Sequence, residues 1–146
     1  MAMQQFNESL PMLLYGALDA VMPRFRKIFK EFGLTEPQWR VLRVLWEHDE
    51  IAFRDVAELT RIPAPSLVGV IDRLSAVELV VRRRSEKDRR LVYLGATSKA
   101  RELEEQVMPI VTGTYAELRA SIDTSVWDQL IAALIEVSAM KPTASK

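Results

Sequence analysis

The chain has no cysteine and only one histidine, His48, in 146 residues. Without thiols, the chain cannot form disulfides, thiolate zinc sites or thiol-based peroxide sensors. A single histidine also argues against a metal sensor built on histidine ligands. Glycine is scarce, with five residues and no GxGxxG run, so no phosphate-binding loop is evident. We therefore expect no metal, no cofactor and no enzyme, because none of the usual catalytic constellations is present.

Long apolar runs are also missing. No run approaches the roughly 20 residues that a membrane-spanning helix needs, and residues 1–10 lack the basic start of a secretory signal. These absences predict a cytoplasmic protein without a membrane partner. The length, together with a hydrophobic content of 49%, suits a single domain over residues 1–146.

Charge is balanced over the whole chain but not along it. Twenty basic residues match twenty acidic ones, whereas residues 61–99 contain nine basic residues against four acidic ones. Such segregation creates one surface that attracts phosphate and another that repels it, so a polyanion would dock in one orientation. A solvated run of charge is the alternative, and the basic residues alone do not decide between the two.

Apolar residues three and four apart predict an amphipathic helix over residues 10–32, in which Pro23 should cause a kink or begin a second segment. Thr35 and Gln38 have the spacing of a capping box, and a helix should follow over TEPQWRVLRVLWEH. Residues 51–53 suggest a short strand, and RDVAELT then predicts one short helix.

The segment RIPAPS joins this short helix to the next one. Residues before proline avoid the α conformation, so Ile62 and Ala64 should be extended. Pro65 suits the first position of a new helix, which we expect over residues 65–77. Helix, tight turn and helix in this order are the layout of a helix-turn-helix.

The helix over residues 65–77 has two distinct faces. One is apolar and should pack inward through Leu67, Ile71 and Leu74. The other face has small side chains at its start and a basic one further on. The helix backbone can therefore approach a DNA groove while Arg73 reaches phosphate or a guanine edge. A bland surface helix would also be polar here, but it would not explain the neighbouring turn and hairpin. The candidate DNA contacts of this helix are Pro65, Ser66, Leu67, Gly69, Val70 and Arg73.

Two strands should follow, over residues 79–84 and 91–94. The loop SEKDRR between them is longer than a two-residue turn and should project from the sheet. Its cations Lys87, Arg89 and Arg90 could reach a minor groove or phosphates, and Asp88 should hold a neighbouring arginine. The fold class is therefore mostly α with a small β-hairpin wing (α+β), a winged helix-turn-helix.

Helices at both ends carry apolar stripes that a module over residues 35–95 cannot cover, and Pro109 and Gly113 should interrupt the long helical region that follows Thr97. Burying a large apolar side chain is worth roughly 1.5–3 kcal/mol, so leaving about a dozen exposed is implausible. A second copy is the simplest partner. We expect residues 8–33 and 97–141 to form dimerisation helices, and a homodimer of this kind would bind a palindromic site in double-stranded DNA.

Three stretches resemble the MarR family of bacterial winged-helix regulators. They are LTEPQWRVLRVL, RDVAELTRIPAPSLVGVIDRLSAVELVVRR and EKDRRLVYLGAT, and the DRRLVYL run is the most specific. TEPQWR and APSLVGVIDRL are similar to the branch that regulates homoprotocatechuate catabolism. The resemblance implies a homodimeric repressor that leaves its operator when a small aromatic acid or phenolic effector binds. It assigns residues 65–77 as the recognition helix and residues 86–90 as the wing.

The sequence departs from the family pattern at two positions. Glu78 stands where the family usually has glycine, so the left-handed helix exit must be strained or replaced. Ala100 also replaces a common glycine, at little cost. Candidate effector contacts are Tyr15, Trp39, Arg40 and Arg43, although a place in the core is the stronger interpretation for the tryptophan and an interface or surface ion pair for the arginines. The alternative function is a winged-helix protein-interaction module without DNA binding.

Overall fold

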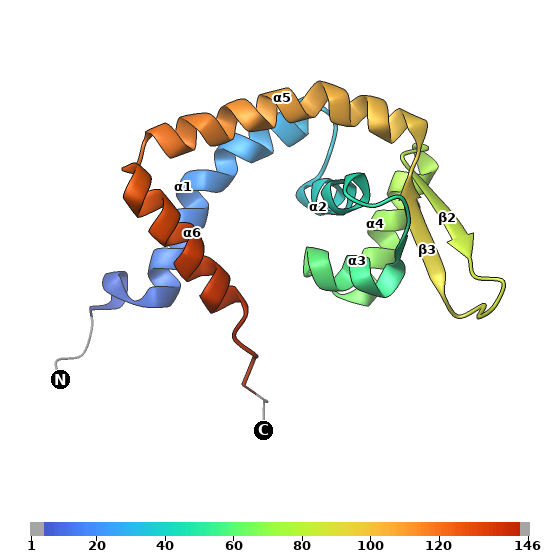
Figure 1. The fold of residues 1–146 in the computed structure, drawn as a ribbon, viewed down its shortest axis with the longest axis horizontal. Coiled ribbons are helices and arrows are strands. Elements are labelled where there is room, and N and C mark those ends of the chain that lie inside the picture. Colours follow the sequence, from blue (N-terminus) through green and yellow to red (C-terminus); the bar gives the residue numbers. More distant parts are fainter. Residues whose placement is uncertain (1–4, 144–146) are drawn as a thin grey trace. The chain divides into compact units, whose positions relative to one another are not determined.

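The computed structural model describes residues 5–143, so the ends of the expected domain, residues 1–4 and 144–146, lie outside the described residues. The chain forms six α-helices, one short 3-10 helix and three strands within this range (Figure 1). Their order is η1 (Phe6–Glu8), α1 (Leu10–Glu31), α2 (Glu36–Trp46), β1 (Ile51–Ala52), α3 (Phe53–Thr60), α4 (Ala64–Ala76), β2 (Val80–Arg84), β3 (Val92–Ala96), α5 (Ser98–Ala120) and α6 (Thr124–Ser138). The expected fold class, mostly helical with a small β-hairpin wing, is confirmed.

The chain divides into two compact units, one ending at Val111 and the other starting at Thr112. The first contains α1 to α4, the sheet and the start of α5. All the buried residues among those described belong to this unit. Its core is built from apolar side chains of every element except η1, with Leu42, Leu45, Leu67, Leu74 and Leu94 fully buried. The second unit contains the end of α5 and all of α6. The bounds predicted for the DNA-binding lobe, residues 35–95, and for the dimerisation helices, residues 8–33 and 97–141, remain predictions.

Local signals placed most helix ends correctly. The capping box is present, with the Thr35 Oγ1 accepting from the Gln38 N–H at 3.3 Å and the Gln38 side chain accepting from the Thr35 N–H at 3.0 Å. Gly33 follows α1 with a φ of +68°, which glycine adopts without steric cost. Asp123 caps α6 by accepting from the Ser125 N–H at 2.9 Å.

The prolines inside helices do not interrupt them. Helix α1 runs through Pro23, and α5 runs through both Pro109 and Gly113. The expectations of a second segment after Pro23 and of an interrupted helix near residue 110 are therefore wrong. Both prolines are exposed, so water can reach the carbonyl that each leaves without its helical partner.

The sheet has the strand order β1-β3-β2, and both pairs are antiparallel. Val80 pairs with Ala96 at the base of the β2–β3 hairpin, and Arg84 pairs with Val92 next to its loop. The second strand of the hairpin therefore extends two residues beyond the predicted range of 91–94. In Figure 1 the loop lies beyond the ends of the strands, as the sequence predicts.

Candidate nucleic-acid interface

Helix α4 begins immediately after a tight turn. The turn starts at Arg61, which closes α3 in the left-handed conformation with a φ of 55°, and it is anchored by the buried side chain of Ile62. Helix α4 starts at Ala64, so the expectation that this residue is extended is wrong. Pro65 still lies in the first turn, where its missing N–H has no helical partner to lose.

The buried face of α4 corrects two of the predicted DNA contacts. Leu67 has no exposed surface and Val70 is only 6% exposed, because both side chains pack into the core of the first unit. Neither can reach a base without unpacking that core. Val68, which the sequence argument passed over, is 49% exposed and is the apolar side chain available on the outward face. Successive residues of a helix point in different directions, so an inward Leu67 directs Val68 away from the core. Helical periodicity therefore could have predicted this residue.

The remaining predicted residues of α4 lie at or near its surface. Pro65, Ser66 and Arg73 are exposed, and Gly69 is half-buried. Arg73 lies over Gly69, since a Cβ built on that glycine would come within 4.0 Å of the Arg73 Nη2. Alanine at this position would therefore make only an ordinary contact. The outward face combines small side chains, one exposed valine and one arginine.

The exit from α4 resolves the question raised by Glu78. This residue has a φ of 61°, the left-handed conformation that the family pattern assigns to glycine. Its N–H donates to the Ser75 carbonyl at 3.0 Å, and the Leu79 N–H donates to the Leu74 carbonyl at 2.9 Å. These two bonds form a Schellman motif, which ends the helix and directs the chain into β2. Holding a glutamate there costs energy of order 1 kcal/mol, but the helix exit is retained.

The wing loop holds one arginine by hydrogen bonds and leaves two other cations exposed to solvent. The Asp88 carboxylate accepts from the Arg90 Nε at 3.1 Å and from the Arg90 backbone N–H at 3.0 Å. The side-chain hydrogen bond, followed by the backbone one, lowers the pKa of Asp88 below its usual 3.8. The predicted role of Asp88 is therefore confirmed. The Arg90 side chain remains 91% exposed. Lys87 and Arg89 are exposed, and neither has an ion-pair partner among residues 5–143.

Two arginines of β2 are occupied by acidic partners. Arg82 donates to Asp72 of α4 and, at 3.3 Å, to Ser75. Arg83 makes a two-point contact with the Glu50 carboxylate at 2.7 and 2.8 Å, and its guanidinium lies 4.8 Å from the centre of the Tyr93 ring. The hydrogen bond from Arg83 lowers the pKa of Glu50 below its usual 4.5. These pairs tie the wing to α4 and to the residue before β1. Asp72 is already counted among the acidic residues of 61–99, so only Glu50 lowers the positive charge of this surface further.

A concavity of about 570 Å³ joins α4 to the wing. Val68 and Ile71 of α4 form part of its wall, and the hairpin contributes Arg84 and Arg90. Arg54, at the start of α3, also lines it and was missed by the sequence argument because it lies outside the basic stretch of residues 61–99. Recognition helix and wing thus border one surface with cations at its edge. This arrangement suits contact with a phosphate backbone on either side of a groove.

The candidate effector residues differ in their exposure and in their partners. Tyr15 is 63% exposed on α1, whereas Trp39 is 9% exposed and stacks on Phe29 with ring centres 4.9 Å apart. Arg43 pairs with Glu47 at 3.0 Å, and Arg40 is half-buried on the same helix. None of the four lines the concavity above or a second pocket of about 460 Å³ near Gln38 and Lys99. The described residues contain no group of three or more side chains suited to hold a metal ion.

Comparison with known proteins decides how this surface is to be understood. A family model described as the MarR family matches residues 32–91. The homoprotocatechuate degradative operon repressor of Escherichia coli is 32% identical, over 92% of this chain and 90% of that one. The chain belongs to the MarR family. The resemblance found in its sequence, including the likeness to the homoprotocatechuate branch, is confirmed.

Solved structures of the family agree with this fold. NadR in complex with 4-hydroxyphenylacetate has a TM-score of 0.81 and 30% identity, covering 97% of this chain and all of that one. The repressor CouR, bound to a 23-mer DNA duplex, has a TM-score of 0.83 and 25% identity, covering 94% and 99%. This chain is therefore a DNA-binding transcriptional regulator of the MarR family, and the alternative of a docking module without DNA binding loses its support. No helix within residues 5–143 is long and apolar enough to cross a membrane.

Proposed function

We propose that this MarR-family chain is a homodimeric repressor that binds a palindromic operator and is released by a small aromatic acid or phenolic compound. It acts by binding DNA and not by catalysis, and we place it in the cytoplasm, with the chromosome. The DNA contacts in this proposal are Pro65, Ser66, Gly69 and Arg73 of α4, with Val68 replacing Leu67 and Val70. Lys87, Arg89 and Arg90 supply the wing.

The exposed apolar face of α6 carries the proposal of a dimer. Val126, Leu130, Ile131 and Ile135 are between 39% and 64% exposed, and α6 has no buried residue. Helix α1 exposes Leu10, Leu13 and Leu18 to a similar extent, each near 55%. Side chains of this kind are stabilised by removal from water, and a second copy removes both sets at once. Two copies of α4 would then meet half-sites about one DNA turn apart, roughly 34 Å.

The effector is proposed from the chemistry of the chain and of its relatives. NadR was solved with 4-hydroxyphenylacetate, and the relative from Escherichia coli is named for homoprotocatechuate degradation. Both names point to small aromatic acids. In this chain Arg40 and Arg43 of α2 are the half-buried cations nearest to aromatic side chains in sequence, and an incoming carboxylate would compete with Glu47 for Arg43. Tyr15 and Trp39 remain candidates for the aromatic part.

The proposal is tested by titrating the purified protein onto the DNA upstream of its own gene. We expect a shifted complex whose affinity falls as salt rises, with a slope of about 0.9 per phosphate contact. Adding 4-hydroxyphenylacetate or another hydroxylated aromatic acid should release the DNA. Binding that no such acid reverses would contradict the effector, and a complex containing one copy of the chain would contradict the dimer.

Arginine variants distinguish contacts to DNA bases from contacts to phosphates. Arg73→Ala should weaken operator binding more than binding to random DNA, by the 1–3 kcal/mol that a base contact is typically worth. Arg90→Ala should weaken operator binding without changing the dimer, because Arg90 is not among the apolar residues proposed for the interface. Equal losses on both DNAs would reduce Arg73 to a phosphate contact.

A further inference from the structure

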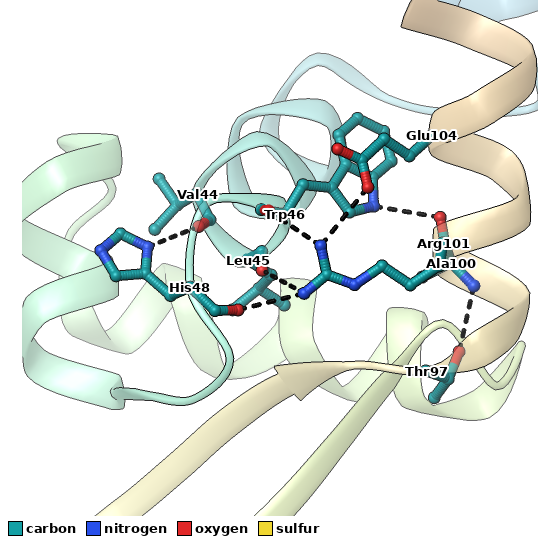
Figure 2. Close-up of polar contacts among 8 residues, drawn as sticks. All are labelled: Val44, Leu45, Trp46, His48, Thr97, Ala100, Arg101 and Glu104. Atoms are coloured by element: carbon teal, nitrogen blue, oxygen red, sulfur yellow. Dashed lines mark hydrogen bonds and ion pairs between the residues drawn. The ribbon is translucent and has the colours of Figure 1, made fainter.

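The first turn of α5 is bound to the end of α2 by a cluster of hydrogen bonds around Arg101 (Figure 2). The Arg101 Nη1 donates to the Trp46 carbonyl at 2.8 Å, and its Nη2 donates to the carbonyls of His48 at 3.2 Å and Leu45 at 3.5 Å. In return, the Trp46 indole N–H donates to the Ala100 carbonyl at 3.0 Å, in the buried interior. One arginine thus contacts two carbonyls in the last turn of α2 and a third just beyond its end.

The end of α2 is suited to this cation. Carbonyls in the last turn of a helix have no helical N–H to accept from, and the helix dipole places partial negative charge there. Arg101 meets that charge with a planar group that can donate to several oxygens at once. Glu104, one turn further along α5, lies 3.4 Å from the same Nη1 and holds the guanidinium from the other side. The side chain is about two-fifths exposed, at 38%, so this is a surface clamp over a buried indole contact.

The same turn of α5 is also bound to the end of the recognition helix. The Thr97 Oγ1 donates to the Glu78 carbonyl at 2.6 Å, and the Lys99 Nζ donates to the Val77 carbonyl at 2.7 Å. Thr97 immediately follows β3, the second strand of the wing. The turn therefore contacts α2, the exit of α4 and the wing within five residues, 97–101.

We propose that Arg101 is a positioning residue for operator recognition. Arg101 contacts no proposed DNA-facing residue, but it holds the start of α5 against the end of α2. Because Thr97 and Lys99 in the same turn bind the exit of α4, this contact sets the angle of α4 and the wing relative to α5. A change in the direction of α5 is transmitted through this clamp to the recognition helix. The inference rests on the proposed dimer, in which two copies of α4 must meet two half-sites at a set spacing.

The test compares Arg101→Met with Arg101→Lys and with the control Glu58→Gln, an exposed glutamate of α3 outside the clamp, on two duplexes. One duplex carries the whole operator and the other a single half-site. Arg101→Met should bind the whole operator roughly tenfold more weakly, equivalent to about 1.4 kcal/mol, while its half-site affinity and its salt slope stay at wild-type values. Arg101→Lys should restore part of the loss because an ammonium can still donate to the carbonyls, and Glu58→Gln should stay within about twofold.

Three results would overturn this role. Equal losses on both duplexes would show general damage to the lobe, a smaller salt slope would show direct phosphate contact, and unchanged operator binding would show no role in recognition. If the wild-type chain itself binds both duplexes equally, the proposed dimer fails. Amide exchange then tests the clamp without DNA, because exchange at residues 77–79 should be faster in Arg101→Met than in Glu58→Gln. Faster exchange confined to residues 45–48 would contradict the clamp.

Discussion

The lobe around α4 buries its large apolar side chains, whereas helix α6 exposes them. In the lobe, Leu42, Leu67 and Leu74 have no exposed surface, whereas Leu130 and Ile131 of α6 are about two-fifths exposed. Both patterns have helical periodicity, and only the surroundings differ. The lobe completes its own core. Helix α6 has a core-like face without a core among the described residues, and the physical cost of that exposure is the reason to expect a second copy.

The largest expected effect comes from placing a charge on the face of α6. Ile131→Asp should weaken the dimer by about 100-fold or more, since an unpaired carboxylate in an apolar contact costs several kcal/mol. Operator binding should fall with it, because one copy meets only one half-site. Leu59→Asp is the control, as Leu59 is 58% exposed on α3 within the lobe. Sedimentation measures the dimer affinity of both variants. An intact dimer in Ile131→Asp would show that α6 is not part of the interface.

A smaller effect is expected from removing apolar atoms rather than adding charge. Leu42→Ala should lower the free energy of unfolding by about 2–5 kcal/mol, the usual cost of a cavity in a packed core. Leu130→Ala, measured at a concentration where the chain is monomeric, should change it by less than about 0.5 kcal/mol. Urea unfolding gives both values. Similar losses in the two variants would show that α6 is packed within the monomer.

The smallest effect concerns the ion pair between Glu50 and Arg83, which belongs to the lobe. The pKa of Glu50 is lowered by the hydrogen bond from Arg83, so the ionised pair stabilises the fold above the ordinary glutamate pKa of 4.5. That contribution is lost as pH falls through the lowered pKa. The difference in urea midpoint between wild type and Glu50→Gln, present at pH 6, should therefore shrink as the pH is reduced below about 4.5. Arg83→Gln should show the same trend, and a difference independent of pH would contradict the pairing.

Much of the fold could be predicted because it depends on local chemistry. The capping box at Thr35, the tight turn before Pro65 and the long loop between two short strands are all encoded within a few residues. The left-handed exit at Glu78 is different, because a glutamate gives no local signal for it: only the resemblance to the family pointed to it and left open whether the exit is strained or replaced. Errors arose where local rules are weak. Pro23 and Pro109 are tolerated because solvent reaches the affected turns, and exposure of this kind depends on the neighbouring elements.

The DNA-facing surface was predicted in part. The helical pattern itself places Leu67 inward, and burial removes both it and Val70 from the contacts, while Val68 and Arg54 enter the surface. The sequence also could not show which cations are available. Arg82 and Arg83 look equivalent to Arg84 in the run VVRRR, but acidic partners on α4 and before β1 engage the first two.

By itself the sequence determined the order of elements, the two faces of α4, the cationic wing and the family. Tertiary structure decided which arginines are free, which apolar residues are buried, and that Arg101 joins α5 to α2 across 53 to 56 residues of chain. The physical reason is one of range. Capping, periodicity and turn chemistry act over a few residues, whereas ion pairing and burial depend on which distant elements packing brings into contact.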